Sequence, residues 1–308
     1  MKKIIIFKYG DGELANQLWN YISIYAYGLF KGVPVRNHSF FEYHSSFNLL
    51  HKEPIWVKFL ALIFTNYSGR KQRPWKKLWR KIYAIYAKFI EKTKKSVYSS
   101  LSPDNIVIYL PPTASRSPID ESKIADSLYL SGWLFRNPEG IKKFRNEITS
   151  AFAPKREIMD KVSKRISILR LAYENVIGIH IRQGDYRTYK LGKHLIDTNR
   201  VREIIDEYIQ EKRISVNATI FIITSDEPID RKYFVGLNYE ISGGNAVTDL
   251  FTLSKCDAII GSNSSFGAFA SWYGDIPQII MTKEPIDWNY YRDKKSFFEN
   301  KYNTMVHY

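Results

Sequence analysis

The chain has 308 residues, enough for one large α/β domain or for two domains of about 150 residues each. Hydrophobic residues make up 44% of it and charged residues 25%, a balance that argues against wholesale disorder and against an integral membrane protein. Its single cysteine, Cys256, excludes an intrachain disulfide framework and a zinc site built from cysteines. This cysteine usage fits a reducing, cytosolic setting.

The amino terminus has the pattern of a strand, a glycine-containing turn and a helix. Residues 3–8 are mostly apolar, and residues 16–30 carry apolar side chains at helical spacing. The first apolar run is shorter than the core of a secretory signal peptide, which needs about seven apolar residues or more, so we expect a buried strand. The three elements predict the opening of a Rossmann-like unit. The turn lacks G-x-G-x-x-G and therefore predicts no dinucleotide site.

The turn at residues 9–15 and the helix start after it hold three polar side chains that chemistry could use. Glu13 and Asp11 are candidate general bases, as is Asp185 in the second half of the chain, and Asn16 is a candidate polar contact. In a two-domain enzyme this turn would face a nucleotide site across a cleft. The alternative is that these residues only cap the helix.

The basic charge of the chain is concentrated in one segment. The formal net charge is +15, and the stretch from Arg70 to Lys95 holds eleven Lys or Arg and one acid, Glu91, so it supplies +10 of the total. A local basic segment indicates docking to an anionic partner, whereas nucleic-acid binding is typical of a broader excess. We therefore expect no nucleic-acid partner.

The basic segment overlaps a predicted amphipathic helix. The preceding apolar run, residues 55–65, is too short to span a bilayer, which takes about 20 residues. The helix pattern predicts peripheral contact with an anionic membrane surface, or else a surface helix with a solvated basic face. The predicted apolar face carries Trp75, Leu78, Trp79, Ile82, Ile85, Tyr86 and Phe89, and the basic face carries Lys76, Lys77, Arg80, Lys81 and Lys88.

The second half alternates short apolar strands with helices, which predicts a parallel sheet with ligands at the carboxyl ends of its strands. We predict two Rossmann-like domains, residues 1–153 and 154–308, with a basic helical insertion at about 55–96 in the first. In the second, the predicted strands cover 176–181, 218–225, 257–261 and 278–281, and the predicted helices 154–171, 198–210, 249–255 and 266–273.

The first of these strands ends in three functional groups, His180, Arg182 and Asp185. Alternation along a strand places His180 and Arg182 on one face. A guanidinium there can bind a diphosphate through two hydrogen bonds and neutralise charge on a departing nucleotide. In the alternative reading, Arg182 and Asp185 form a structural ion pair and His180 is a packed core residue.

Two further strand ends carry polar groups. Asp226 follows the strand at 218–225 and could accept hydrogen bonds from guanine or ribose, or cap the next helix. The run Gly261 to Gly267 lies at a helix start, where backbone N–H groups and hydroxyls favour a phosphate, although an ordinary serine cap is the alternative. The candidate binding residues in that run are Asn263, Ser264, Ser265 and Phe266.

Four ordered motifs resemble the α-1,2-fucosyltransferases of glycosyltransferase family 11, within the wider α-1,2, α-1,6 and protein O-fucosyltransferase group. The segment from His180 to Tyr186 matches H-x-R-x-G-D-Y completely. The segment from Gly10 to Tyr21 is similar to G-G-L-G-N-Q-L-F-Q-Y around its Asn-Gln pair. The other two matches are Leu130 to Pro138, and Asp249 to Gly274, which includes N-S-[ST]-F.

The resemblance implies a GT-B fold, with two Rossmann-like domains whose parallel sheets face a cleft and with the donor held mainly by the carboxy-terminal domain. It implies that Arg182 grips the diphosphate of GDP-fucose, that His180 and Asp226 lie near the guanosine, and that Ser264, Ser265 and Phe266 close over the phosphates or base. It also implies inversion without a metal, which agrees with the lack of a D-x-D at any predicted strand end.

The resemblance leads us to expect transfer of fucose to a glycan acceptor, with an α-1,2 linkage, in surface polysaccharide synthesis. Two alternatives stay open: a GT-B transferase that uses another nucleotide sugar, and a non-catalytic protein that binds membranes or polyanions through Arg70 to Lys95. We expect a cytoplasmic location, either free or peripheral on the inner face of the membrane.

Overall fold

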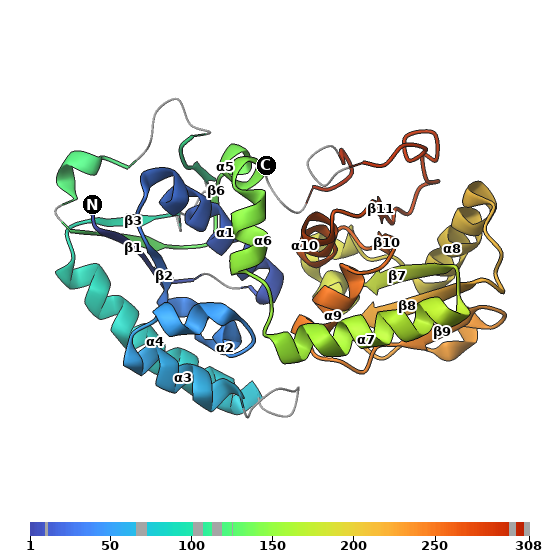
Figure 1. Cartoon of the computed structure of the whole chain (residues 1–308), viewed down its shortest axis with the longest axis horizontal. Coiled ribbons are helices and arrows are strands. Elements are labelled where there is room, and N and C mark those ends of the chain that lie inside the picture. The colour runs from blue at the N-terminus through green and yellow to red at the C-terminus, as the bar shows by residue number, and fades with distance from the viewer. Residues whose placement is uncertain are drawn as a thin grey trace. The chain divides into compact units, whose positions relative to one another are not determined.

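The computed structural model describes residues 1–9, 12–65, 73–100, 107–112, 119–124, 126–295 and 300–304. They divide into two compact units, one formed by Met1–Lys155 and the other by the described residues from Arg156 onward. The predicted domain boundary, between residues 153 and 154, lies close to this division. Each unit is built around its own parallel sheet (Figure 1).

The first unit has a four-stranded sheet in the order β2-β1-β5-β3, with all neighbouring strands parallel. Its central strand β1 coincides with the predicted strand, because Ile4 to Phe7 are all buried. The following helix begins at Leu14, earlier than predicted, and ends at Lys31; the next residue, Gly32, has a φ of 65°, which suits glycine. The strands are β1 (Lys3–Lys8), β2 (Val35–Asn37), β3 (Val97–Ser99) and β5 (Ser127–Ser131), with a separate pair β4 (Ile108–Tyr109) and β6 (Phe135–Arg136).

Six helices of this unit pack around the sheet within the described residues. Helix α1 contributes the aromatic side chains Trp19, Tyr21 and Tyr27 to the core, each almost fully buried. The helices are α1 (Leu14–Lys31), α2 (Phe41–His44), α3 (Ile55–Thr65), α4 (Arg73–Thr93), α5 (Pro138–Lys143) and α6 (Arg145–Ala151). Over the part of the chain that the structure describes, no helix is both long and apolar enough to cross a bilayer.

Helix α4 confirms the predicted helix, but its faces differ from the prediction. Tyr83, Ala87 and Ile90 form the buried side, against α2, α3 and strand β1, while Trp79 and Tyr86 are half-buried beside them. The predicted apolar face therefore has two parts, one half-buried beside the core and one exposed to solvent. Its remaining members whose side chains are described are exposed to solvent: Leu78, Ile82, Ile85 and Phe89. The side chains of Trp75 and Lys76 lie outside the described residues.

Arg80 lies on the exposed side of α4, as predicted, with 46% of its side chain exposed. Its guanidinium bonds both carboxylate oxygens of Glu42, with Nε–Oε1 at 2.6 Å and Nη2–Oε2 at 3.2 Å. Arg80 is thus a structural residue that ties α4 to α2.

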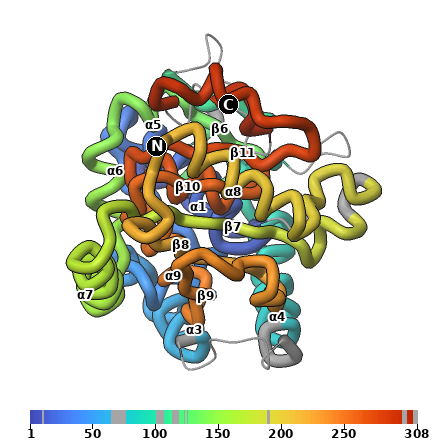
Figure 2. The backbone as a smooth tube through the Cα atoms, turned by 90° about the vertical axis from the view of Figure 1, so that its right-hand side faces the viewer, coloured from blue at the N-terminus to red at the C-terminus, as the bar shows by residue number. Residues whose placement is uncertain are grey.

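The second unit has a five-stranded parallel sheet in the order β11-β10-β7-β8-β9, which Figure 2 shows strand by strand. The apolar strands were predicted from sequence, except β9, whose residues are only half-buried. The strands are β7 (Asn175–Ile181), β8 (Thr219–Ser225), β9 (Asn238–Ile241), β10 (Ala258–Gly261) and β11 (Gln278–Ile280), and the helices are α7 (Arg156–Ala172), α8 (Thr198–Lys212), α9 (Ala246–Leu253) and α10 (Ser265–Gly274).

Alternation along β7 divides its side chains between two helical layers. Ile177, Ile179 and Ile181 belong to the same core cluster as the apolar side of α8. Gly178 and His180 point to the opposite face, where a Cβ on Gly178 would lie 2.7 Å from a methyl group of Leu253 in α9. Helices on both faces of a parallel sheet give the doubly wound, Rossmann-like arrangement, which places the functional side chains at the carboxyl ends of the strands.

Candidate functional site

Three adjacent strands of the second unit end at one rim and bring the predicted donor-site residues together. In register, His180 of β7 pairs with Thr224 of β8 on one side and with Gly261 of β10 on the other. The residues that follow these strands, Arg182, Asp226 and Ser262, therefore lie on neighbouring chain segments. These residues lie at the carboxyl ends of neighbouring parallel strands, as predicted from the sequence. Their contacts with a ligand stay predictions.

His180 is a buried, neutral imidazole at the centre of this rim. The Thr224 hydroxyl donates to the Ile179 carbonyl, so its oxygen accepts from His180 Nδ1–H, at 3.3 Å. His180 Nε2 then accepts from the Ser264 hydroxyl, at 3.0 Å. Burial first, and then the charge of Arg182, lower the pKa of His180 to about 3, against an opposing effect of Asp226.

The imidazole of His180 also packs against Phe266. The Phe266 ring stacks on the His180 ring, with centroids 4.9 Å apart and an interplanar angle of 28°. His180 thus fixes the position of both Ser264 and Phe266. It is a core residue whose two ring nitrogens are both hydrogen-bonded within the protein.

Asp226 holds the backbone of the turn after β7. Its Oδ1 accepts from the Gln183 N–H at 2.9 Å, and its Oδ2 accepts from the Gly184 N–H at 3.1 Å. A Cβ on Gly184 would lie 2.8 Å from that second oxygen, so a larger residue would push the carboxylate away. The predicted contact of Asp226 with guanosine is untested, whereas its role in shaping the turn follows from these two bonds.

Arg182 is anchored at its backbone and at Nε. Its N–H donates to the Ser262 hydroxyl at 3.0 Å, its Nε donates to Asp185 Oδ1 at 2.9 Å, and Asp226 Oδ2 lies 3.8 Å from Nε. Burial opposes the charged form, yet the bond to Asp185 and the charges of Asp185 and Asp226 raise the pKa of Arg182 above its usual value. Within the described part of the chain, its two terminal Nη groups have no hydrogen-bond partner. They remain able to donate to a ligand.

The start of helix α10 adjoins Arg182. Ser264 is the N-cap, and its Oγ accepts from the Gly267 N–H at 3.4 Å. Gly267 has no room for a side chain, since a Cβ there would lie 2.5 Å from the amide nitrogen of Gln278. The positive end of the helix dipole and the first-turn amides favour an anion at this position.

Asn263 has a partner that the sequence analysis missed. Its side-chain amide bonds Thr304 twice, from Nδ2 to the Thr304 hydroxyl at 2.8 Å and from the Thr304 N–H to Oδ1 at 3.2 Å. Its carbonyl accepts from the Tyr186 hydroxyl at 2.7 Å. The Asn263 side chain therefore fastens a segment 41 residues further along the chain, and its predicted contact with the donor stays a prediction.

In the first unit, Glu13 and Asn16 lie where the turn after β1 meets α1. Glu13 makes no capping bond to the helix; instead its Oε2 accepts from the Tyr43 hydroxyl at 2.7 Å, and Arg80 Nη2 lies 3.9 Å from Oε1. Asn16 is half-buried beside Gly12. The other candidate base, Asp11, lies outside the described residues.

Another amide of the same motif has a structural function. Asn20, fully buried, donates to the Gly132 carbonyl at 3.1 Å and accepts from the Phe135 N–H at 3.1 Å. Two of the four sequence motifs thus meet in this unit through one side chain. Sequence spacing gave no sign of this contact, because its partners are more than 100 residues apart.

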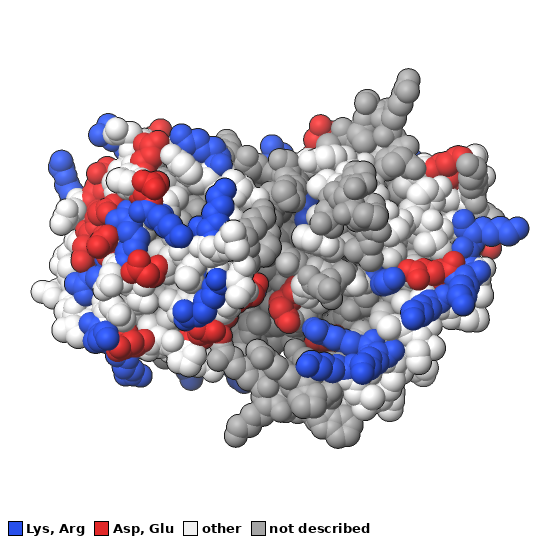
Figure 3. Space-filling view, turned by 180° about the vertical axis from the view of Figure 1, so that it is seen from behind, with Lys and Arg blue, Asp and Glu red and all other residues white. Residues whose placement is uncertain are grey.

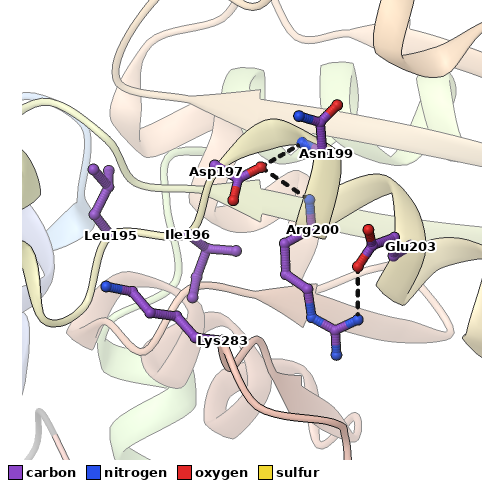
Figure 4. Close-up of a pocket in the computed structure, with 7 residues that line it drawn as sticks. All are labelled: Leu195, Ile196, Asp197, Asn199, Arg200, Glu203 and Lys283. Carbon is purple, nitrogen blue, oxygen red and sulfur yellow. Dashed lines mark hydrogen bonds and ion pairs between the residues drawn. The ribbon is translucent and has the colours of Figure 1, made fainter.

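A cavity of about 540 Å³ opens at the start of α8, away from the predicted donor residues (Figure 4). Asp197 caps the helix there, accepting from the N–H groups of Asn199 and Arg200. A neighbouring cavity of about 220 Å³ reaches the turn after β7, where Gln183 and Arg187 line it. Arg182 itself lines neither of these two cavities.

Comparison with known protein families finds one match, which includes the H-x-R-x-G-D-Y segment and the segment from Asp249 to Gly274. The family model described as glycosyl transferase family 11 matches residues 140–302. No curated protein sequence matches the chain.

Among solved structures, the fold is similar to that of an Arabidopsis thaliana FUT1 mutant in complex with GDP, with a TM-score of 0.52, 11% identity, and coverage of 92% of this chain and 71% of that one. The fucosyltransferase NodZ from Bradyrhizobium has a TM-score of 0.49, 12% identity and coverage of 91% and 95%. The apo form of POFUT1 has a TM-score of 0.45, 12% identity and coverage of 91% and 97%. The likeness to FUT1 confirms the predicted fold class, GT-B with parallel sheets. Because the family model covers more than half of the residues, the chain belongs to glycosyl transferase family 11.

Proposed function

We propose that this glycosyltransferase is inverting and metal-independent and moves fucose from GDP-fucose to a hydroxyl of a glycan acceptor. Family membership supports sugar transfer. The likeness in fold to FUT1, which was solved with GDP, supports the nucleotide. The resemblance of the segment from His180 to Tyr186 to the H-x-R-x-G-D-Y motif of fucosyltransferases supports fucose as the sugar.

The observation that carries the proposal is which nitrogens of the Arg182 guanidinium have hydrogen-bond partners. Its Nε is held by Asp185, while its terminal nitrogens lack partners among the described residues. The loop that leads to the Ser264-capped start of α10 meets the backbone of Arg182, since the Arg182 N–H donates to the Ser262 hydroxyl at 3.0 Å. A guanidinium and the amino terminus of a helix are both groups that bind a diphosphate.

In the proposed reaction the acceptor hydroxyl attacks the anomeric carbon of fucose, and the bond from that carbon to the β-phosphate oxygen breaks. The electron pair of that bond leaves with GDP, where Arg182 and the α10 amides neutralise the charge. The hydroxyl proton passes to a carboxylate. We assign this role to Glu13, with its hydrogen bond from Tyr43, and we assign to Asp185 the positioning of the guanidinium.

The donor can be identified by thermal shift and donor hydrolysis with GDP-fucose, GDP-mannose and UDP-sugars. We expect stabilisation by both GDP-sugars and turnover of GDP-fucose. Stabilisation by UDP-sugars alone would refute the nucleotide assignment. A transfer assay on a glycan array, followed by linkage analysis, then tests the α-1,2 linkage and the expected acceptor in a surface polysaccharide.

The same assay tests the proposed independence from metals. Arg182 and the α10 amides supply the positive charge that a divalent ion would otherwise supply. We expect turnover to be unchanged by EDTA. Loss of turnover that added Mg²⁺ or Mn²⁺ restores would contradict the proposal.

A further inference from the structure

Helices α3 and α4 expose an unusual amount of apolar surface. We call the seven side chains involved the apolar stripe; they are between 45% and 85% exposed. On each helix they recur at intervals of three or four residues, which puts them on one face. The members are Ile55, Phe59 and Leu62 of α3 and Leu78, Ile82, Ile85 and Phe89 of α4.

The apolar stripe is a local feature. Of the thirteen large apolar side chains exposed among the described residues, these seven lie on two helices of the first unit. They add nothing to the core, because other faces of α3 and α4 form it: Val57 and Phe64 of α3 and Tyr83 of α4 are buried in one cluster. A stripe that is exposed, continuous along α4 and unnecessary for packing indicates a docking surface.

A row of lysines flanks the stripe on α4. Lys77, Lys81, Lys88 and Lys92 are exposed, and none of the four is in an ion pair with any residue that the structure describes. The one acid of α4, Glu91, is paired with Lys8 at 2.8 Å. Figure 3 shows the Lys and Arg side chains, in blue, and the Asp and Glu side chains, in red, on one face of the molecule. The charge is therefore uncompensated beside an apolar surface.

We propose that the apolar stripe and its lysines dock the protein on the surface of an anionic lipid bilayer. Helix α4 lies in the plane of the interface, the apolar side chains enter the boundary between headgroups and acyl chains, and the ammonium groups meet lipid phosphates. Nucleic acid would use the lysines but would leave the stripe in water. A second copy of the chain, paired symmetrically through this surface, would bring two lysine rows together.

Docking through α4 also concerns Glu13, and this consequence depends on the proposed function. Arg80 of α4 bonds Glu42 and lies 3.9 Å from Glu13, so the helix is tied to the proposed base within one unit. A membrane-bound α4 would hold Glu13 near acceptors that are themselves anchored in lipid.

The test is co-sedimentation of the full chain with vesicles of phosphatidylcholine, alone or mixed with phosphatidylglycerol. We expect binding to the anionic vesicles only, and weaker binding at high ionic strength. Two double variants are made, Ile85→Ser with Phe89→Ser and Lys81→Glu with Lys88→Glu. Each should lower the partition coefficient at least about tenfold. The matched control is Ile168→Ser with Leu171→Ser on α7, where the side chains are 55% and 88% exposed and no change is expected.

The thermal midpoint of each variant shows whether it is folded. Its rate of donor hydrolysis tests the proposed function separately from vesicle binding. Equal binding to both kinds of vesicle, or binding that neither double variant weakens, overturns the proposal. Absence of vesicle binding together with self-association that the Ile85→Ser and Phe89→Ser variant abolishes would assign the surface to a second copy of the chain. These outcomes are independent of donor turnover, so either inference can fail alone.

Discussion

At the scale of single residues, Arg182 owes its proposed role to a fixed guanidinium. Arg182→Lys keeps the positive charge but loses the Nε bond to Asp185 and the planar pair of Nη donors. We expect turnover of GDP-fucose to fall about a hundredfold or more, with weaker binding of GDP. Steady-state kinetics and calorimetric titration with GDP measure the two effects.

The matched control is Arg187→Lys, in the same turn. Arg187 is exposed, and its Nη2 bonds Glu227 at 3.0 Å, so it contributes a surface ion pair. Its replacement should change turnover little. An equal loss in both variants would mean that the turn responds to any change of charge, and the special role of Arg182 would be lost.

Asp226 gives a second prediction at this scale, one of stability. In Asp226→Asn the amide nitrogen cannot accept a hydrogen bond, so the Gln183 or the Gly184 N–H loses its acceptor. We expect a loss of about 2 kcal/mol in the free energy of unfolding, measured by urea denaturation. Asp206→Asn, which breaks a surface pair with Arg202, should cost less than about 1 kcal/mol. A cost for Asp226→Asn no larger than that of Asp206→Asn would show that the two bonds do not hold the turn.

At the scale of elements, α9 and α10 share a capping geometry but differ in surroundings. Asn245 caps α9 by accepting from the Val247 and Thr248 N–H groups, and Ser264 caps α10 while donating to His180. Ser264→Ala and Asn245→Ala should each cost about 1 kcal/mol in the free energy of unfolding. Only Ser264→Ala should weaken GDP binding, because the loop before α10 bonds the backbone of Arg182 through Ser262. Equal GDP affinities in the two variants would remove α10 from the proposed site.

Some of the helices and strands could be predicted from the sequence alone, and others could not. Strands β7, β8, β10 and β11 were predictable because buried parallel strands are continuous apolar runs. Strand β9 was not, since NYEI is polar and half-buried at the edge of the sheet. The faces of α4 were misassigned because its apolar side chains cover two adjoining faces, one against α3 and one in solvent, and the helical period cannot separate them.

For the site, the sequence predicted which residues gather at the rim but not what each one does there. Strand ends and motifs indicated His180, Arg182, Asp226 and Ser264. The clamp of Asp226 on Gly184 and the bonds of His180 to Thr224 and Ser264 join residues 42 to 84 positions apart. Such contacts depend on the register of the folded sheet, which local patterns do not contain.

At the scale of the whole molecule, four buried titratable groups connect stability to pH. Burial lowers the pKa of His180 and His38 to about 3 and that of His44 to about 4, and it raises the pKa of Glu53 to about 7. His38 and His44 each lie within 4 Å of Glu53, at 3.8 and 3.7 Å, in the first unit. All four are therefore neutral in the folded chain at mildly acidic pH.

The sign of the pH effect follows from which state binds more protons. Below pH 6.5 the unfolded chain protonates its histidines, while the folded chain does so only near pH 3 to 4, so each histidine costs stability on acidification, about 1.4 kcal/mol per pH unit. Glu53 acts in the opposite direction between pH 4.5 and 7, because the folded state keeps its proton there and loses that advantage as the pH rises. The combined effect of the three histidines on the free energy of unfolding is larger than the opposite effect of Glu53. The free energy of unfolding should therefore fall as the pH drops from 6.5 towards 4.5.

Urea denaturation at a series of pH values measures the slope of the free energy of unfolding against pH. Two variants test which histidines cause this slope. His180→Asn should reduce the slope by roughly one histidine's share, about 1.4 kcal/mol per pH unit. His51→Asn, which replaces an exposed histidine, is the matched control. A stability that is flat or rises on acidification over this range would show that the buried imidazoles take up protons in the folded state. In that case His180 could not serve as the neutral acceptor of the Ser264 hydroxyl on which the arrangement of the α10 start depends.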